Sequence, residues 1–308
     1  MDVPAVPVTG RNTSMNNRTF RDRLAPYLYI TPIGAILLVF VAVSVVLSVI
    51  LSFTHYNILQ PPTFAGLDNY TRLFQDSKFI KAFWNTLMLM IIVIPLQMVV
   101  SLIVSAFLVD QRKTVLGKIA NWAIFVPVLC SNAVVGVVWR EMLNMHTGVI
   151  QSVLGLFHVD ASMLLGNEST ALVTLAFIAV WKNIGYYTII YYSGMLGISD
   201  TYYEAARMDG AGKLRYFFSI TLPLLKPSLI LTLFLSVAGS VQYYDLIANL
   251  TGGGPNNATT TLVVYAYSMC FGTGNAGYAM AIANILLLIV ILFSLLQRKL
   301  AGREASLI

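Results

Sequence analysis

Charged side chains are scarce in this sequence. Asp, Glu, Lys and Arg make up 10% of the 308 residues, whereas apolar residues make up 57%. A soluble globule needs a polar surface around its core, and this chain has too little polar surface to build one. A soluble enzyme, a nucleic-acid-binding protein and a disordered scaffold are therefore excluded. The formal net charge of +6 is attributed to basic loops beside a membrane.

Cysteine and histidine are scarce as well. The two cysteines, Cys130 and Cys270, lie in or beside apolar stretches and do not make a disulfide framework, and whether they pair is left open. The three histidines are scattered, and the sequence has no HExxH, no CxxC and no serine nucleophile elbow. We therefore expect no catalytic residues, no metal site and no cofactor in this chain.

Long apolar stretches are abundant. A helix needs about 20 apolar residues to cross the bilayer core, and six stretches reach that length. The fourth carries Lys182 near its middle, and the fifth carries Asp245 near one end. The sequence predicts an all-α, polytopic membrane protein whose six transmembrane helices cover about residues 29–53, 82–109, 119–139, 171–197, 228–250 and 276–297.

The basic residues alternate between the two sides of this six-helix arrangement. Fourteen of the 19 Lys and Arg residues fall on the side of both tails, and only four fall in the opposite loops, namely Arg72, Lys78, Lys81 and Arg140. Because cytoplasmic loops carry the excess of Lys and Arg, both termini are predicted to be cytoplasmic. The expected organisation is a tail at 1–28, a transmembrane domain at 29–297 and a tail at 298–308.

The predicted cytoplasmic loop at 200–227 has an unusual composition. Residues 202–214 are rich in helix formers and carry apolar and aromatic side chains on one side, which predicts a short helix outside the bilayer. Gly210 and Gly212 are expected to break or bend this helix, and Pro223 restricts the start of the fifth span. The loop is therefore predicted to form a cytoplasmic knob between the fourth and fifth transmembrane helices.

This loop resembles the EAA loop of ABC importer permeases, whose pattern is Glu-Ala-Ala, three residues, Gly, nine residues and Ile-x-Leu-Pro. Every fixed position is matched here, by Glu204, Ala205, Ala206, Gly210, Ile220, Leu222 and Pro223. The resemblance implies that these residues and Asp209 form a coupling helix, which docks in a cleft of a cytoplasmic ATPase. Lys213 lacks the rest of a phosphate-binding loop, so ATP and Mg²⁺ are expected in the partner ATPase.

Other segments narrow the resemblance to the maltose-type carbohydrate subfamily. The end of the first span and the loop after it are similar to the opening of those permeases, and the TGGGP segment at 251–255 is similar to their loop before the last helix. The residues of the opening are Ser52, Phe53, Thr54, Phe64, Gly66, Leu67, Asn69 and Tyr70. The resemblance implies the first of two unlike permease subunits in a bacterial cytoplasmic membrane. The sugar and its length stay open.

Polar side chains inside the predicted spans are candidates for the transport pathway. A charge at mid-membrane costs about 2.5 to 3.5 kcal/mol on insertion scales, so Lys182 is expected to face a partner or an aqueous cavity. Tyr and hydroxyl groups suit a sugar, because rings cover its apolar faces and hydroxyls exchange hydrogen bonds. Helix packing is an equally good explanation for the serines. The candidates are Lys182, Asn183, Tyr186, Tyr187, Ser236, Ser240 and Tyr243.

The sequence thus favours a permease subunit of an ATP-driven carbohydrate importer. The resemblance implies three kinds of partner besides membrane lipids, which are a second and similar permease, two ABC ATPase subunits and an external solute-binding protein. One alternative is a permease of the same machinery for a non-sugar solute. A less favoured alternative is a secondary transporter driven by an ion gradient, although no internal repeat supports that class.

Overall fold

The computed structural model describes residues 20–144, 148–155 and 162–301, so most of both predicted tails lies outside the described residues. The chain divides into two compact units, residues 1–50 and 51–308. In the first unit, α1 (Phe20–Leu37), a π-helical segment η1 (Leu38–Val43) and the start of α2 (Ser44–Ser52) follow one another without a break. Residues 29–52 of this helix are apolar enough to cross a membrane, in agreement with the first predicted span.

The second unit is almost entirely helical. It begins with a two-stranded antiparallel hairpin, β1 (Thr54–His55) and β2 (Thr63–Phe64), in which Thr54 pairs with Phe64. A short amphipathic helix follows, and a long span then begins at Ser77. The helices of the first half are α3 (Asp68–Gln75), α4 (Ser77–Asp110), α5 (Val115–Leu129), α6 (Asn132–Met142), α7 (Val149–Gly155) and α8 (Ser162–Gly166).

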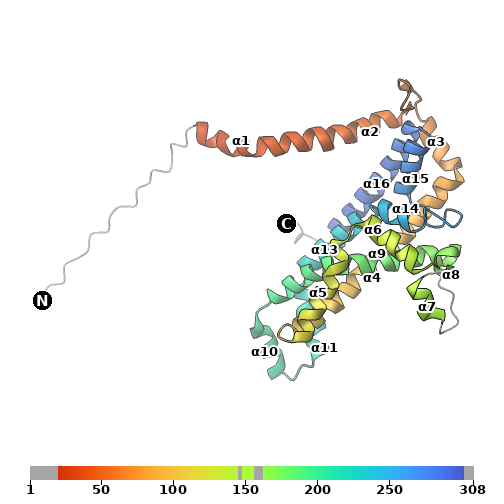
Figure 1. The fold of residues 1–308 in the computed structure, drawn as a ribbon. Helices are drawn as coiled ribbons and strands as arrows, with labels where there is room; N and C mark the ends of the chain where they lie inside the picture. Colours follow the sequence, from red (N-terminus) through yellow and green to blue (C-terminus); the bar gives the residue numbers. More distant parts are fainter. Residues whose placement is uncertain (1–19, 145–147, 156–161, 302–308) are drawn as a thin grey trace, which may run out of the picture. The chain divides into compact units, whose positions relative to one another are not determined.

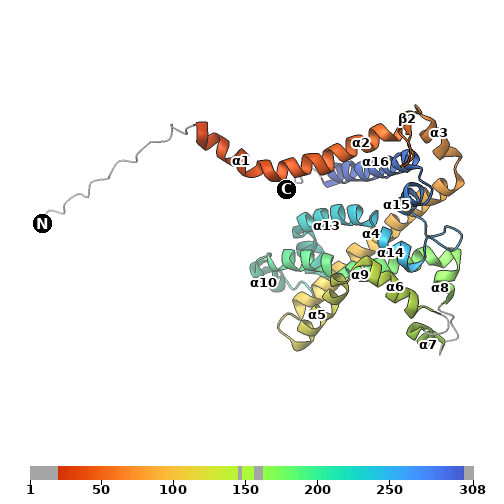
Figure 2. The same cartoon turned by 45° about the horizontal axis from the view of Figure 1, so that its top comes forward.

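The second half of this unit contains the remaining spans. Its helical segments are α9 (Glu168–Leu196), α10 (Asp200–Met208), α11 (Lys213–Tyr216), η2 (Phe217–Thr221), α12 (Leu222–Leu224), α13 (Lys226–Ser240), α14 (Tyr244–Leu250), α15 (Leu262–Tyr267), η3 (Ser268–Gly272) and α16 (Ala276–Ala301). Figures 1 and 2 both show α10 at one end of the unit, and α3 with α15 at the other; Figure 1 shows α11 beside α10.

The prediction of an all-α membrane protein is confirmed. Among the described residues, four helices are individually long and apolar enough to cross a membrane. The number rises to as many as six if two bent pairs, α5 with α6 and the segment Lys213–Leu224 with α13, each count as one span. The four individual candidates are the helix at residues 29–52 and the helices α4, α9 and α16.

Two of the predicted spans are broken rather than continuous. Within 119–139, α5 ends at Leu129 and α6 starts at Asn132, with a bend of 103° between them. Ser131 caps α6, because its side chain accepts a hydrogen bond from the Val134 N–H. Within 228–250, α13 ends at Ser240 and α14 starts at Tyr244. Both apolar runs look continuous in the sequence. In the structure each is interrupted where one helix ends and the next begins.

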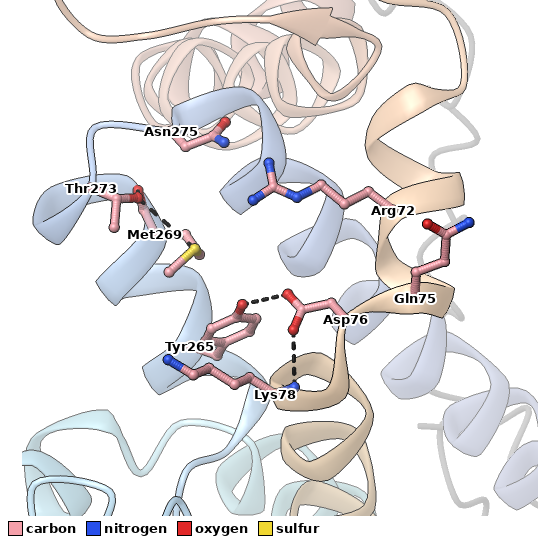
Figure 3. Close-up of a pocket in the computed structure, with 8 residues that line it drawn as sticks. All are labelled: Arg72, Gln75, Asp76, Lys78, Tyr265, Met269, Thr273 and Asn275. Carbon is pink, nitrogen blue, oxygen red and sulfur yellow. Dashed lines mark hydrogen bonds between the residues drawn. The ribbon is translucent and has the colours of Figure 1, made fainter.

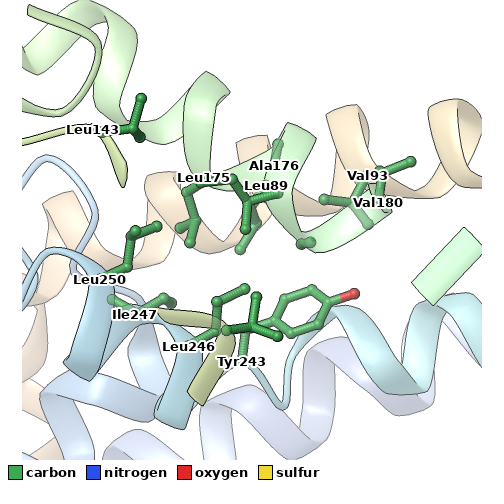
Figure 4. Packing of buried hydrophobic residues seen from close by; sticks show 13 residues of the cluster. Leu89, Val93, Leu143, Leu175, Ala176, Val180, Tyr243, Leu246, Ile247 and Leu250 are labelled. Atoms are coloured by element: carbon green, nitrogen blue, oxygen red, sulfur yellow. The ribbon is translucent and has the colours of Figure 1, made fainter. Parts of the chain in front are cut away.

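The core beside these breaks is built from helices distant in sequence. Leu89 and Val93 of α4 pack with Leu175 of α9 and with Leu246 and other residues of α14 (Figure 4). Because lipid tails are as apolar as these side chains, close van der Waals packing rather than transfer out of water stabilises contacts between spans. The core therefore holds α14 against the long spans.

Candidate functional site

Helix α10 carries the Glu-Ala-Ala motif and has defined signals at both ends. Ser199 caps its start by accepting a hydrogen bond from the Thr201 N–H. At its end, the Ala211 N–H donates to the Ala206 carbonyl and the Gly210 N–H donates to the Arg207 carbonyl. This pair of bonds is a Schellman motif, which requires the left-handed conformation that Gly210 adopts with φ of +72°. The sequence predicted a helix over residues 202–214 that Gly210 and Gly212 break or bend. In the structure α10 ends at Met208, and a separate helix α11 begins at Lys213.

The inner face of α10 packs back on its own loop. Tyr203 makes an edge-to-face ring contact with Tyr216 at a centroid distance of 5.5 Å, and its hydroxyl lies 3.1 Å from the Thr221 hydroxyl oxygen. Ala206 is buried on the same face. Because α10 has only nine residues, these contacts rather than intrinsic propensity hold it in place.

The outer face of α10 is open. Glu204 and Ala205 are exposed, Asp209 is exposed, and the Met208 side chain is 89% exposed. Of the other motif residues, Ile220 and Leu222 are half-buried and Pro223 is exposed. The Glu204 side of α10 is therefore an exposed, partly apolar surface.

An exposed ion pair links the knob formed by residues 200–227 to one of the spans. The Lys213 Nζ lies 3.0 Å from the Asp110 Oδ2 at the end of α4. Beyond the knob, the Tyr191 hydroxyl of α9 lies 2.6 Å from the Thr232 hydroxyl of α13, where both residues are buried. Sequence reasoning missed Tyr203, Asp110 and Tyr191, because their partners are far away in the chain and no local pattern marks them.

The structure brings three of the predicted pathway residues together. The Lys182 Nζ lies 3.4 Å from the Asn183 Oδ1, and the Asn183 Nδ2 donates to the Tyr243 hydroxyl at 3.3 Å. Lys182 and Asn183 are half-buried, whereas Tyr243 is buried. No ion pair of Lys182 with a carboxylate occurs among the described residues. The break between α13 and α14 is what places Tyr243 opposite Asn183.

The remaining pathway candidates divide between the surface and the interior. Tyr186 is 44% exposed, and its ring packs edge to face on Tyr187, which is buried. Ser236 and Ser240 are both buried in α13, and the Ser240 hydroxyl donates to the Val237 carbonyl at 2.8 Å. Their burial is compatible with helix packing, so Lys182, Asn183 and Tyr186 are the candidates whose side chains are accessible.

A polar cluster that the sequence did not reveal fixes the TGGGP loop. The Asn85 side chain donates to the backbone carbonyls of Asn257 and Thr260, at 2.8 and 2.9 Å. The Lys81 Nζ donates to the Asn256 carbonyl at 2.7 Å and lies 3.1 Å from the Glu168 Oε2. The loop is thus bound to the first turns of α4 and α9.

The described part of the chain holds no group of three or more His, Cys, Asp and Glu residues arranged for a metal ion. What the geometry offers instead is a set of membrane spans, a polar helix face and an exposed helical knob at one end. Together these features define the class of protein as a polytopic membrane transport subunit.

Comparison with known proteins identifies the family to which the chain belongs. The family described as "Binding-protein-dependent transport system inner membrane component" matches residues 70–305. The chain belongs to this family. It is 33% identical over 289 residues to the probable ABC transporter permease protein YurN of Bacillus subtilis (strain 168), a match that covers 92% of this chain and 99% of YurN.

Two further proteins show how far the similarity extends. The multiple sugar-binding transport system permease protein MsmF of Streptococcus mutans is 34% identical over 242 residues, which covers 78% of this chain and 82% of MsmF. A chain from the crystal structure of a bacterial alginate ABC transporter, in complex with an alginate pentasaccharide-bound periplasmic protein, has a TM-score of 0.79 at 21% identity. That match covers 92% of this chain and 95% of the other. It confirms the fold of an importer permease.

Proposed function

We propose that this chain is the permease subunit of an ATP-driven importer that carries a carbohydrate across a bacterial cytoplasmic membrane. The observation that carries the proposal is the knob at 200–227, whose α10 holds the complete Glu-Ala-Ala pattern on an exposed surface. A helix with an open outer face and a fixed inner face suits a partner that pushes on it. The chain itself needs no nucleotide site for this role, because hydrolysis belongs to the ATPase.

A carbohydrate is the solute class that the polar helix face favours. Asn183 and Tyr186 offer amide, hydroxyl and ring surfaces to a solute, while Lys182 adds a donor with positive charge. MsmF is named for the transport of multiple sugars, and the alginate transporter carries a polysaccharide. Their similarity to this chain supports the same class of solute here. The sugar itself is not specified by these contacts.

The proposed complex contains four further subunits. A second permease is required, because two ATPases that close around two nucleotides need one coupling helix each. An external solute-binding protein delivers the sugar, as the family description and the periplasmic protein in the alginate complex suggest. In this arrangement both termini and the knob face the cytoplasm, which agrees with the distribution of Lys and Arg.

The proposed mechanism is alternating access. Closure of the ATPases displaces α10, and the displacement reorients the spans from an inward-facing to an outward-facing state. The solute then moves along the face of α9 that carries Lys182 and Tyr186. The same spans form the inward-facing and the outward-facing state, so the change between these states requires only that helices move relative to one another.

Two measurements test this proposal. Extraction in mild detergent followed by mass spectrometry is expected to recover a second permease and an ATPase with this chain. In reconstituted liposomes, Met208→Glu is expected to abolish ATP-driven uptake, because it places a charge on the exposed surface of α10. The matched control is Met163→Glu, since Met163 is 65% exposed on α8, outside the knob. Sugar uptake without any ATPase would refute the proposal.

A further inference from the structure

A cavity of about 480 Å³ lies at the end of the second unit away from the knob. It opens between the α3–α4 junction on one side and α15, η3 and the start of α16 on the other (Figure 3). No residue of the proposed transport mechanism lines it. The lining residues are Arg72, Gln75, Asp76, Lys78, Tyr265, Met269, Thr273 and Asn275.

The carboxylate in this cavity already has its partners. The hydroxyls of Tyr265 and Tyr278 both donate to the Asp76 Oδ2, and the backbone N–H groups of Lys78 and Phe79 donate to its Oδ1. Partial burial opposes ionisation, but these hydrogen bonds outweigh it and lower the pKa of Asp76 below its ordinary value of 3.8. Asp76 is therefore a charged structural link between α4, α15 and α16.

The two basic residues in the lining, Arg72 and Lys78, differ from Asp76 in their pairing. Among the described residues, no ion pair joins Arg72 or Lys78 to a carboxylate. The Arg72 guanidinium carbon lies 4.5 Å from the centroid of the Tyr278 ring, and this stacking leaves the N–H groups at the edge of its plane. Figure 3 shows the guanidinium extending from α3 into the space below Asn275.

These groups define the chemistry of a ligand. Two cations beside one satisfied carboxylate leave an excess of one positive charge, and Gln75 and Asn275 add amide donors to the lining. An anion with several acceptor oxygens fits, because a guanidinium fork binds such oxygens in pairs. A phosphate diester has a single negative charge and two free oxygens, so it matches both the charge and the donors.

The position of the cavity indicates the source of the phosphate. Two apolar spans begin beside it, α4 at Ser77 and α16 at Ala276, so it lies where membrane spans meet water. Lipid phosphates occupy that level of the membrane. Phe74 adjoins the lining residue Gln75, and Phe271 lies two positions from Met269 and Thr273; their side chains are 79% and 66% exposed. We propose that this cavity binds the phosphate group of a membrane phospholipid through Arg72 and Lys78.

The test counts phospholipids bound to the purified complex in detergent, by native mass spectrometry after addition of phosphatidylglycerol. The wild-type protein is expected to retain lipid that Arg72→Gln and Lys78→Gln lose. Loss of one charge-assisted hydrogen-bonding group predicts an affinity about ten-fold lower. Lys78→Gln keeps the Lys78 backbone N–H that Asp76 accepts, so it tests the site even if Arg72→Gln misfolds. The matched control is Arg112→Gln, which changes an exposed basic residue outside the lining.

Separate additions distinguish the possible sources. Inorganic phosphate at millimolar concentration is expected to leave the bound lipid in place. Displacement of the lipid by phosphate, or equal lipid retention by the wild type and both cavity variants, would overturn the proposal. Weaker docking of a solute-binding protein to the variants, with unchanged lipid, would assign the cations to that partner instead and would also overturn it. None of these outcomes depends on whether the chain transports a sugar.

Discussion

Two glycines of the knob provide a matched pair for testing how α10 is held. Gly210 has φ of +72°, whereas Gly212, two residues later, has φ of −74°. A side chain at either position meets no atom within 4 Å, so steric contact does not distinguish them. Replacement of each by Ala therefore isolates the cost of the left-handed backbone conformation.

The expected magnitudes follow from this geometry. An alanine in the left-handed region costs about 1–2 kcal/mol, so Gly210→Ala strains the Schellman motif that ends α10. A cost of this size lowers the population of the folded helix end relative to its unfolded form by about 5- to 30-fold. Gly212→Ala carries no such penalty. Because alanine gives the unfolded chain fewer conformations than glycine does, this substitution is expected to stabilise the folded state by about 0.4–1 kcal/mol. Gly210→Asn is expected to lie between them, because Asn tolerates this conformation.

The assay is ATP-driven sugar uptake in liposomes, measured beside the rate of ATP hydrolysis in the same complex. Gly210→Ala is expected to reduce uptake per ATP hydrolysed, while Gly212→Ala stays near the wild-type ratio. Complex assembly, measured by co-purification of the ATPase, shows whether the variant protein is intact. Equal ratios for Gly210→Ala and Gly212→Ala would refute the argument that backbone conformation at Gly210 controls the knob.

Three further predictions concern the spans and their outer ends. Lys182→Met is expected to lower sugar uptake without loss of assembly, and normal uptake would remove Lys182 from the pathway. Asn85→Leu loses two donated hydrogen bonds to the TGGGP loop, which predicts about 1–3 kcal/mol lower stability in thermal unfolding; an unchanged midpoint would show that the loop is held by other contacts. Since the folded-state pKa of Asp76 is lowered, its ionised form stabilises the protein above pH ~4, and this contribution disappears as pH falls through the folded pKa. The stability difference between wild type and Asp76→Ala is therefore expected to be constant from about pH 5 to 8 and to shrink below about pH 4, and a difference that falls between pH 8 and 5 would contradict this sign.

Much of the fold could be predicted because membrane spans and helix ends are encoded locally. The length of an apolar run decides whether a helix can cross the bilayer, and the glycine at position 210 marks the end of α10. The break at Cys130 and Ser131 was not predictable in the same way. Pro127 and Ser131 are compatible with a continuous span, and the cap becomes visible only when the Ser131 side chain accepts from the Val134 N–H.

The polar contacts between distant segments could not be predicted at all. Asn85 and Asn257 are separated by 172 positions, and Asp76 and Tyr278 by 202. Each of these residues is unremarkable in its local sequence, where an amide or a tyrosine near the end of a span is common. Their pairing depends on how α4, α15 and α16 come together, which no periodicity in the sequence records.

The contacts in and near the knob differ in how well they can transmit a displacement of α10 to the spans. The Lys213–Asp110 pair is exposed, at 75% and 56% for the two side chains, and exposed pairs contribute about 0–1 kcal/mol. A force on α10 would break such a pair before it moved α4. The buried Tyr191–Thr232 hydrogen bond joins α9 to α13 within a packed interface, where a lost partner costs more.

The close approach of α9 and α13 supports the same conclusion. A Cβ on Gly194 would lie 2.6 Å from the Ser228 Oγ, so the two helices touch directly at this position. The segment from Lys213 to Leu224 continues into α13 across a bend of 69°, so the knob is linked to α13 through the chain itself. From α13 a displacement of the knob passes into α9, because packed helices shift together more readily than they separate. We therefore expect α9, which carries Lys182 and Asn183, rather than α4 to respond first to the ATPase.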